Sequence, residues 1–164
     1  MGLLISSFSE MLREQTARQF LEARKEKIEE LIYCESGPLV LGDLVNFKFG
    51  QPLDGEMEES GRFQVYGAGG PIGWTDKALS KGKTIIIGRV GSIKIHYSEK
   101  AVWVTNNAMF VGEDDIKHPN LLDHKYLYYA LLSLEPQLKQ IFGQGSVLKT
   151  ITKKQLESIP VLPR

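Results

Sequence analysis

The sequence predicts an α+β fold, in which a small mixed β-sheet domain with C-terminal helices is preceded by a long N-terminal helix. Residues 7–33 contain no proline or glycine and are rich in helix-forming side chains. All glycines except Gly2 follow residue 36, where short β-rich runs alternate with turns. Beyond Pro119 the pattern becomes helical again. We therefore expect a helical arm at residues 1–34 and a separate domain at residues 35–164.

The bulk composition fits a soluble globular protein. A length of 164 residues with 42% hydrophobic side chains allows one domain with its own core. The single cysteine, Cys34, leaves no internal disulfide and no cysteine-based zinc site, which fits a reducing cytoplasm. The apolar runs are too short to span a bilayer, and the start lacks the cationic region of a signal peptide. We expect a cytoplasmic protein that makes no membrane contact.

The N-terminal helix carries a narrow apolar stripe on a polar, mixed-charge surface. Ser7 and Glu10 have the spacing of a capping box at its start. The stripe lies at helical spacing and consists of Ala17, Leu21, Ile28 and Leu31. Such a helix is too polar for a core. We expect it to pack on a partner helix or to lie across the domain surface.

Six short runs are predicted strands, at residues 46–49, 62–66, 83–88, 92–97, 101–105 and 108–112. The third and fourth runs are joined through Arg89-Val90-Gly91 and are expected to form a hairpin. In its second arm, Lys94 and His96 share the face opposite the apolar residues.

Three helical segments are predicted towards the C-terminus. Residues 124–134 have a largely apolar face, and Pro136 is expected to start a second short helix, Gln137–Phe142. Thr152 and Gln155 form a capping box that opens a last helix, which ends near Ser158.

The zero net charge hides an uneven distribution along the chain. Residues 35–60 carry one lysine against six acidic side chains, a net of −5. Residues 61–112 carry seven basic side chains against two acidic ones, a net of +5. The second segment fits a basic face for nucleic acid and fits solvated loop charges equally well.

Motifs for catalysis and nucleotide binding fail on spacing or context. The glycine-rich segment 67–73 has Ile72 where a dinucleotide fingerprint needs glycine, and Lys83 with Thr84 precedes a predicted strand instead of a helix. A nuclease pair of Asp123 and Lys125 is a weaker hypothesis than a helix cap at Asp123. The three histidines lack metal-site spacing. We expect a binding protein without catalytic residues, metal or cofactor.

A resemblance is carried by an ordered series of motifs between residues 39 and 163. They are Leu41-Gly42-Asp43-Leu44, Gly50-Gln51-Pro52, Val65–Gly73, Ile85–Ser92, Trp103–Ala108, Tyr126–Tyr129, Gly145-Ser146, Ile151–Leu156 and Ile159–Pro163. Each motif is weak alone. Their order and spacing resemble the target-recognition domain of the specificity subunits of type I restriction–modification systems.

This resemblance implies a function and a set of partners. Such subunits read a bipartite sequence in double-stranded DNA, one half per recognition domain, and hold modification (methyltransferase) and restriction subunits around it without catalysis of their own. Family members usually have two recognition domains separated by long spacer helices, whereas this sequence has one domain with its helix first. A half-length subunit that forms a homodimer or pairs with a second half, a fragment, and a decayed gene that acts only as a protein-interaction module all stay open.

Side chains suited to phosphates and base edges are the candidate DNA contacts. They are Arg62, Lys77, Lys81, Lys83, Arg89, Lys94, His96, Asn106, Gln144, Ser146 and Lys149. Several have structural alternatives. Arg89 also fits a structural ion pair, Lys94 and His96 fit a solvated sheet face, and Asn106 fits a turn. The glycines at 67–73 fit a tight turn better than a phosphate contact.

Overall fold

The computed structural model describes residues 12, 15, 16, 19, 40–91, 93–120, 122–142 and 150–160. The elements of the domain are α2 (Leu41–Leu44), β1 (Lys48–Phe49), β2 (Phe63–Gly67), β3 (Gly70–Thr75), β4 (Thr84–Gly88), β5 (Ile95–Ser98), β6 (Trp103–Val104), β7 (Ala108–Gly112), the 3-10 helix η1 (Glu113–Asp115), α3 (His124–Phe142) and α4 (Lys153–Glu157). This order of short strands followed by helices confirms the α+β prediction.

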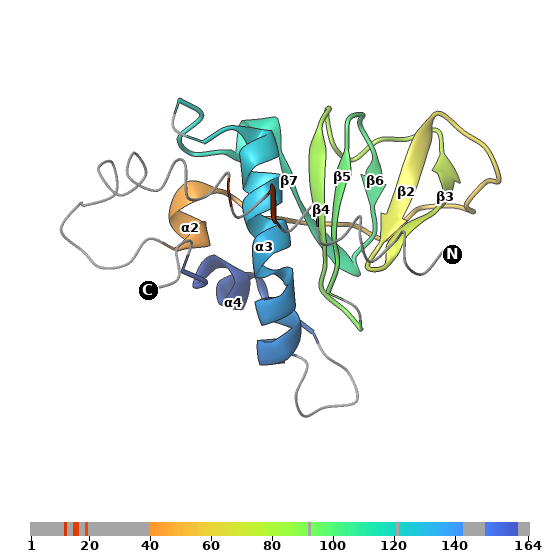
Figure 1. Ribbon diagram of the computed structural model, residues 1–164. Helices are drawn as coiled ribbons and strands as arrows, with labels where there is room; N and C mark the ends of the chain where they lie inside the picture. Colours follow the sequence, from red (N-terminus) through yellow and green to blue (C-terminus); the bar gives the residue numbers. More distant parts are fainter. Residues whose placement is uncertain are drawn as a thin grey trace.

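The strands form two sheets. One has the order β1-β7-β4-β5 with antiparallel pairs, and the other has the order β3-β2-β6 with one parallel pair, β2 with β6. The helices lie on one side of the four-stranded sheet, and the three-stranded sheet lies on its other side (Figure 1). β1 is an edge strand of the larger sheet.

The predicted hairpin around Arg89 is confirmed as β4 and β5. Its register pairs Ile85 with Tyr97 and Ile86 with His96. The buried strand β4 sends alternate side chains into two cores, because successive residues of a strand point to opposite faces. Ile85 belongs to the core against the helices, and Ile86 belongs to the core between the sheets.

Strand β3 was not predicted from the sequence. Only residues 67–70 form the expected glycine turn, and the chain then continues as β3, with Gly70 at a positive φ of 130°. Pro71 and Gly73 are residues that are depleted in strands, so the segment has a weak strand signal. β3 tolerates Pro71 because it is an edge strand, where a missing backbone donor is not needed for a central ladder.

The prediction of two helices separated at Pro136 is wrong. α3 runs from His124 to Phe142 with Pro136 inside it. Leu134 and Leu138, which flank the proline, are both buried in the same core cluster. The apolar face is therefore continuous across Pro136, and its burial against the sheet offsets the lost helical hydrogen bond.

Two predicted helix starts are confirmed. The Thr152 hydroxyl accepts the Gln155 N–H at 3.2 Å, and the Gln155 side chain accepts the Thr152 N–H at 2.9 Å. Asp123 Oδ1 accepts the N–H groups of Lys125 and Tyr126 at 2.9 and 3.1 Å, as an N-cap does.

The ends of the described domain lie side by side. Val40 and Pro160 form an antiparallel bridge, and the Leu41 N–H donates to the Ile159 carbonyl at 2.9 Å.

In the N-terminal arm, the described residues are helical and exposed, and they are Leu12, Gln15, Thr16 and Gln19. The rest of residues 1–39 lies outside the described residues, including the capping pair and the stripe of Ala17, Leu21, Ile28 and Leu31. The division at residue 34 stays a prediction.

Within the described residues no helix is long and apolar enough to cross a membrane. In the same part of the chain, no group of three or more His, Cys, Asp or Glu side chains is placed to hold a metal ion.

Candidate nucleic-acid interface

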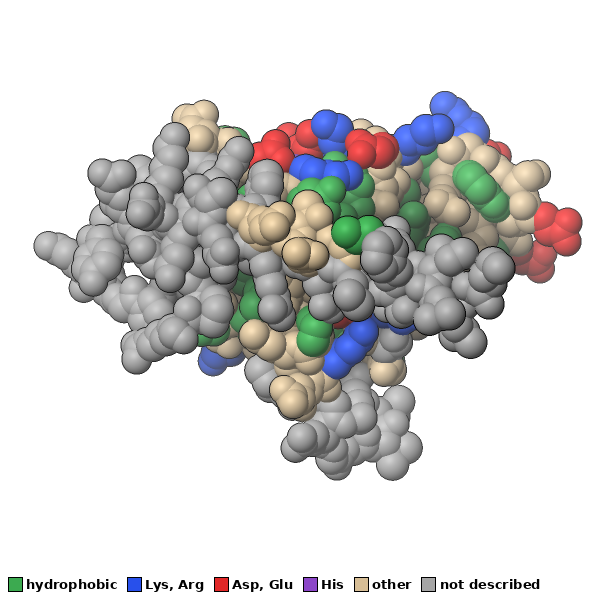
Figure 2. All heavy atoms as spheres, in the orientation of Figure 1, with side chains coloured by type: hydrophobic (Ala, Val, Ile, Leu, Met, Phe, Trp, Pro, Cys, Tyr) green, Lys and Arg blue, Asp and Glu red, His purple; other side chains and the backbone are tan. Residues whose placement is uncertain are grey.

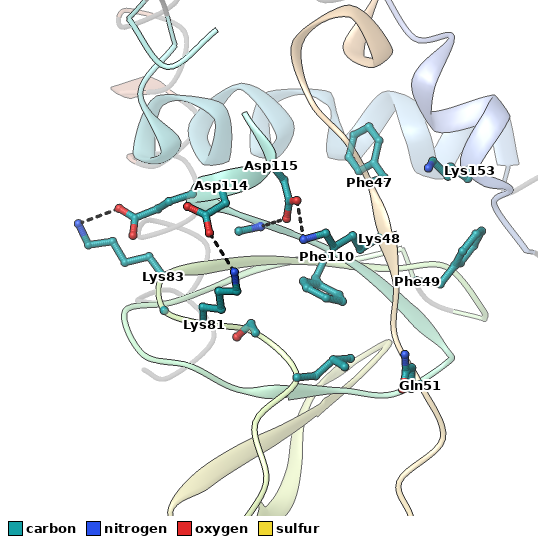
Figure 3. A pocket seen from close by; sticks show the side chains of 15 residues that line it. Phe47, Lys48, Phe49, Gln51, Lys81, Lys83, Phe110, Asp114, Asp115 and Lys153 are labelled. Atoms are coloured by element: carbon teal, nitrogen blue, oxygen red, sulfur yellow. Dashed lines mark hydrogen bonds and ion pairs between the residues drawn. The ribbon is translucent and has the colours of Figure 1, made fainter. Parts of the chain in front are cut away.

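A groove of about 530 Å³ follows the edge strand β1. We call it the β1 groove (Figure 3), and its lining side chains come from β1, the loop before β4, β7, η1 and α4: Phe47, Lys48, Phe49, Gln51, Lys81, Lys83, Phe110, Glu113, Asp114, Asp115 and Lys153. The lining includes three phenylalanines, four lysines and three acidic side chains. This combination of cations and apolar surface suits a phosphate-bearing ligand.

The register of β4 and β7 places lysines beside carboxylates in this groove. Thr84 of β4 pairs with Gly112 of β7 in antiparallel orientation. Lys83 precedes Thr84 and Glu113 follows Gly112, so the two residues lie next to each other. The ammonium of Lys83 lies 3.5 Å from Glu113, and that of Lys81 lies 3.6 Å from Asp114. The charges of two predicted DNA contacts are therefore partly neutralised in the free protein.

A third lysine–carboxylate pair of the groove is of another kind. Lys48 Nζ lies 2.6 Å from Asp115, whose side chain is only 6% exposed. The second oxygen of Asp115 accepts the Gly112 N–H at 2.8 Å. A buried carboxylate with an ion pair and a backbone donor is a structural group, and it fixes the start of η1 beside β1.

Arg89 lies at the opposite end of β4 from Lys83. Its guanidinium carbon lies 5.1 Å from the centre of the Phe49 ring, and its Nη1 donates to the Asn106 carbonyl at 3.2 Å. Its Nε is covered and has no partner among the described residues. No acidic side chain of the described residues forms an ion pair with Arg89, so an aromatic ring and a carbonyl hold it in place. Phe49 links it to the β1 groove.

Asn106 lies in the tight turn between β6 and β7. The turn is closed by the Ala108 N–H, which donates to the Thr105 carbonyl at 3.0 Å. The Asn106 side chain is exposed on this turn, beside Arg89. Asn106 can therefore be part of this turn and still present its side chain to a ligand.

Residues 150 and 151 lie beside Arg89. Val90 and Thr150 form an antiparallel bridge, and the Ile151 N–H donates to the Arg89 carbonyl at 2.9 Å. The candidate contacts Gln144, Ser146 and Lys149 lie outside the described residues.

Lys94 and His96, which were expected to share a face, have different surroundings. Lys94 is exposed. The His96 ring lies between the two sheets, 6.0 Å from the Tyr66 ring, and its Nε2 is covered and has no described partner. Burial lowers the pKa of His96 below its usual value; Glu135 and a hydrogen bond with the Ala68 backbone oppose this shift, and Lys94 reinforces it. His96 is therefore a half-buried side chain at the edge of the inter-sheet core.

The glycine turn at residues 67–70 packs against this histidine. A Cβ placed on Gly70 would lie 3.3 Å from the His96 Cε1 atom, and the positive φ of Gly70 favours glycine. These contacts give the turn a structural role at the edge of the inter-sheet core.

Arg62 and Lys77 adjoin the two paired strand ends at the other end of the β2–β3 hairpin. The pairing of Phe63 with Thr75 brings their strand ends side by side. Both are exposed, and the guanidinium of Arg62 lies 5.4 Å from the Phe63 ring centre. Figure 2 shows lysine and arginine side chains along the upper edge of the molecule, interspersed with aspartate and glutamate.

The alternative nuclease pair has structural contacts on both members. Asp123 is the cap of α3 described above. Lys125 lies 3.3 Å from Glu99 and 3.8 Å from the centre of the Tyr97 ring. These contacts account for both residues without a catalytic role.

Of the residues that line the groove, only Lys81 and Lys83 were predicted as contacts from the sequence. Those missed include Lys48, Phe49, Gln51 and Lys153, and the acidic residues Glu113, Asp114 and Asp115. The signal for Lys48 and Phe49 was the predicted strand at 46–49, in which an aromatic residue follows a lysine. Lys153 could not be found in this way, because α4 reaches the groove only through tertiary packing.

Comparison with known proteins identifies the family. Residues 38–162 match the family described as the type I restriction modification DNA specificity domain. The chain belongs to this family. The matched range contains the β1 groove, Arg89 and both sheets, and the family is that of the non-catalytic specificity component. No curated protein sequence matches the chain.

Solved specificity subunits share the fold. The S subunit of the type I restriction–modification system from M. genitalium matches with a TM-score of 0.66 and 21% identity over 78% of this chain and 34% of its own. The HsdS subunit from Thermoanaerobacter tengcongensis matches with a TM-score of 0.53 and 16% identity over 98% of this chain and 44% of its own. A structure from work on the assembly and conformational transition of the type I system matches with a TM-score of 0.57 and 17% identity over 96% and 44%. This specificity domain spans less than half the length of each.

Proposed function

We propose that this chain reads one half of a bipartite sequence in double-stranded DNA, as the specificity component of a type I restriction–modification system. The observation that carries the proposal is the match to the DNA specificity domain family over residues 38–162. On this proposal the chain performs no methyl transfer or cleavage itself. It acts in the cytoplasm, where it holds modification and restriction subunits on the DNA.

The β1 groove supports this function through phosphate contacts. Lys81 and Lys83 are exposed on its wall, and Lys153 of α4 lies in the same lining. Arg62 and Lys77 add exposed cations near the end of the β2–β3 hairpin. Phosphate contacts of this kind fix the orientation of a protein on a duplex without reading its sequence.

The end of β4 supports base reading. Arginine recognises guanine and asparagine recognises adenine through paired hydrogen bonds in the major groove. Phe49 and the Asn106 carbonyl hold the Arg89 guanidinium in one orientation, and its Nη2 has no hydrogen bond to a described residue. Lys94 and the segment with Gln144, Ser146 and Lys149 complete the proposed contacts, since residue 150 pairs beside Arg89.

A single half-site gives modest affinity, because few base contacts are available to it. Two linked recognition halves bind far more tightly through effective concentration. We propose that the stripe of Ala17, Leu21, Ile28 and Leu31 provides this link by packing on the helix of a second copy or of another recognition half.

The proposal is tested by fluorescence anisotropy of a labelled duplex titrated with the full chain at several salt concentrations. The logarithm of the association constant is expected to fall linearly with the logarithm of salt concentration, because phosphate contacts release counterions. The double variant Arg89→Ala/Lys94→Ala is expected to bind more weakly than the charge-matched variant Lys100→Ala/Lys154→Ala. Both control lysines are exposed and form no ion pair with a described residue.

Absence of binding at low salt by the folded wild-type chain would overturn the proposal. If a modification subunit still bound this chain and its Arg89→Ala/Lys94→Ala variant equally, the chain would be a protein-interaction module instead.

A further inference from the structure

The three lysine–carboxylate pairs of the β1 groove fall into two classes (Figure 3). The Asp115 pair is short and buried on its acidic side. The other two are long and exposed on both sides, with side-chain exposures of 90% and 74% for Lys81 and Asp114, and 48% and 53% for Lys83 and Glu113. Exposed pairs of this kind stabilise a fold only weakly. Glu113 and Asp114 are therefore not needed to hold the groove together.

Glu113 and Asp114 contribute little to stability, but their charges reduce the attraction of Lys81 and Lys83 for anions. Lys81 and Lys83 sit on the wall of a concave surface, where unpaired ammonium groups would attract phosphate. Glu113 and Asp114 place anionic oxygens within ion-pair distance of these ammonium groups. A carboxylate at that position competes for the lysine with an incoming phosphate oxygen, because both ligands are anions that accept from the same N–H donors.

We propose that Glu113 and Asp114 are built-in competitors of DNA phosphates for Lys83 and Lys81. This inference rests on the proposed DNA-reading function. In the free protein and in complexes with arbitrary DNA, the carboxylates compete for both lysines, and the duplex gains less counterion release from them. The effect suppresses sequence-independent affinity, which depends on phosphate contacts. The Arg89 end of the site is left unchanged, since no described acidic side chain pairs with Arg89.

The test compares the full chain with the variant Glu113→Gln/Asp114→Asn, in which both side chains keep their size and lose their charge. The control is Glu56→Gln/Glu59→Gln, which removes the same two charges from exposed residues that form no ion pair with a described residue. The probe is a labelled duplex of arbitrary sequence, and the measurement is its affinity as a function of salt. Thermal melting of each variant checks the fold.

The groove variant is expected to bind this duplex roughly three- to ten-fold more tightly than wild type at low salt, and its salt slope is expected to steepen by up to about 0.9 for each lysine released. The control is expected to keep the wild-type slope. Adding Lys81→Gln and Lys83→Gln to the groove variant is expected to cancel the gain.

Two outcomes overturn the inference, and they are distinguishable. If wild type binds DNA and the groove and control variants show the same slope, the carboxylates do not compete, and the proposed function stands. If neither wild type nor any variant binds the duplex at low salt while folded, the proposed function fails and the inference fails with it. Each single variant, Glu113→Gln or Asp114→Asn, is expected to give about half of the change in affinity. The single variants replace the double variant in this test if the double variant has a lowered melting temperature.

Discussion

At the residue scale, close backbone approach decides which glycines are required. Gly50 follows β1, where its N–H donates to the Ala108 carbonyl at 3.0 Å. A Cβ at this position would lie 2.0 Å from the Thr105 carbonyl oxygen and 2.6 Å from the Val104 carbonyl oxygen. Because these neighbours are backbone atoms held in β6 and its turn, they cannot move aside. Gly69 is the opposite case, with nothing within 4 Å of such an atom.

This contrast gives a stability prediction. Gly50→Ala is expected to lower the free energy of unfolding by about 3 kcal/mol, at the upper end of overpacking costs, because the clash is with backbone. Gly69→Ala, the matched control, is expected to stay within about 0.5 kcal/mol of wild type. Urea denaturation measures both. Equal stabilities of the two variants would show that Gly50 does not lie this close to the backbone of Val104 and Thr105.

At the element scale, α3 contains a residue that weakens it. Pro136 removes one backbone donor from the middle of a 19-residue helix and is exposed, so it packs little. We expect Pro136→Ala to raise the free energy of unfolding by about 2 kcal/mol, which is the regained helical bond less the greater entropy of the unfolded chain.

The control for this variant is Gln137→Ala, the next exposed position of α3. It is expected to change stability by less than about 0.5 kcal/mol. A decrease in the melting temperature of Pro136→Ala, measured by circular dichroism, would contradict a continuous helix through residue 136.

Elements with strong local signals were predictable from the sequence, and others were not. The alternation around Ile93 and Ile95 predicted the β4–β5 hairpin, and the Thr152–Gln155 spacing predicted the start of α4. β3 escaped prediction because its glycines and Pro71 give no strand signal. The continuity of α3 was not predicted, because proline usually ends a helix. In this helix, burial of Leu134 and Leu138 on either side of Pro136 outweighs that local preference.

The site was less predictable than the fold, because its charges are set by pairing across the sheet. Residues 61–112 have a net charge of +5 in sequence, yet the acidic triplet that neutralises Lys48, Lys81 and Lys83 begins at Glu113, one residue later. The pairing of β7 with β4 and with β1 reveals this relationship. The same register separates the predicted contacts into a lysine group at one end of β4 and the Arg89 group at the other.

At the scale of the whole molecule, the lysines proposed to contact phosphates and the residues proposed to read bases lie along neighbouring parts of one surface. The lining of the β1 groove includes the paired lysines and Phe49. The Phe49 ring contacts the Arg89 guanidinium, which donates a hydrogen bond to the Asn106 carbonyl. Residues 40 and 160 meet in one bridge, so the two ends of the described domain lie together. This arrangement is compatible with the proposed role of one recognition half joined to a helical spacer.

The most direct test of sequence-specific DNA recognition is selection of duplexes from a random pool by the purified chain, followed by sequencing of the retained DNA. One short sequence is expected to be enriched over successive rounds at moderate salt, and Arg89→Ala is expected to relax the preference at one or two positions. Retention of the pool without enrichment of any sequence, by a chain shown to be folded, would contradict this expectation.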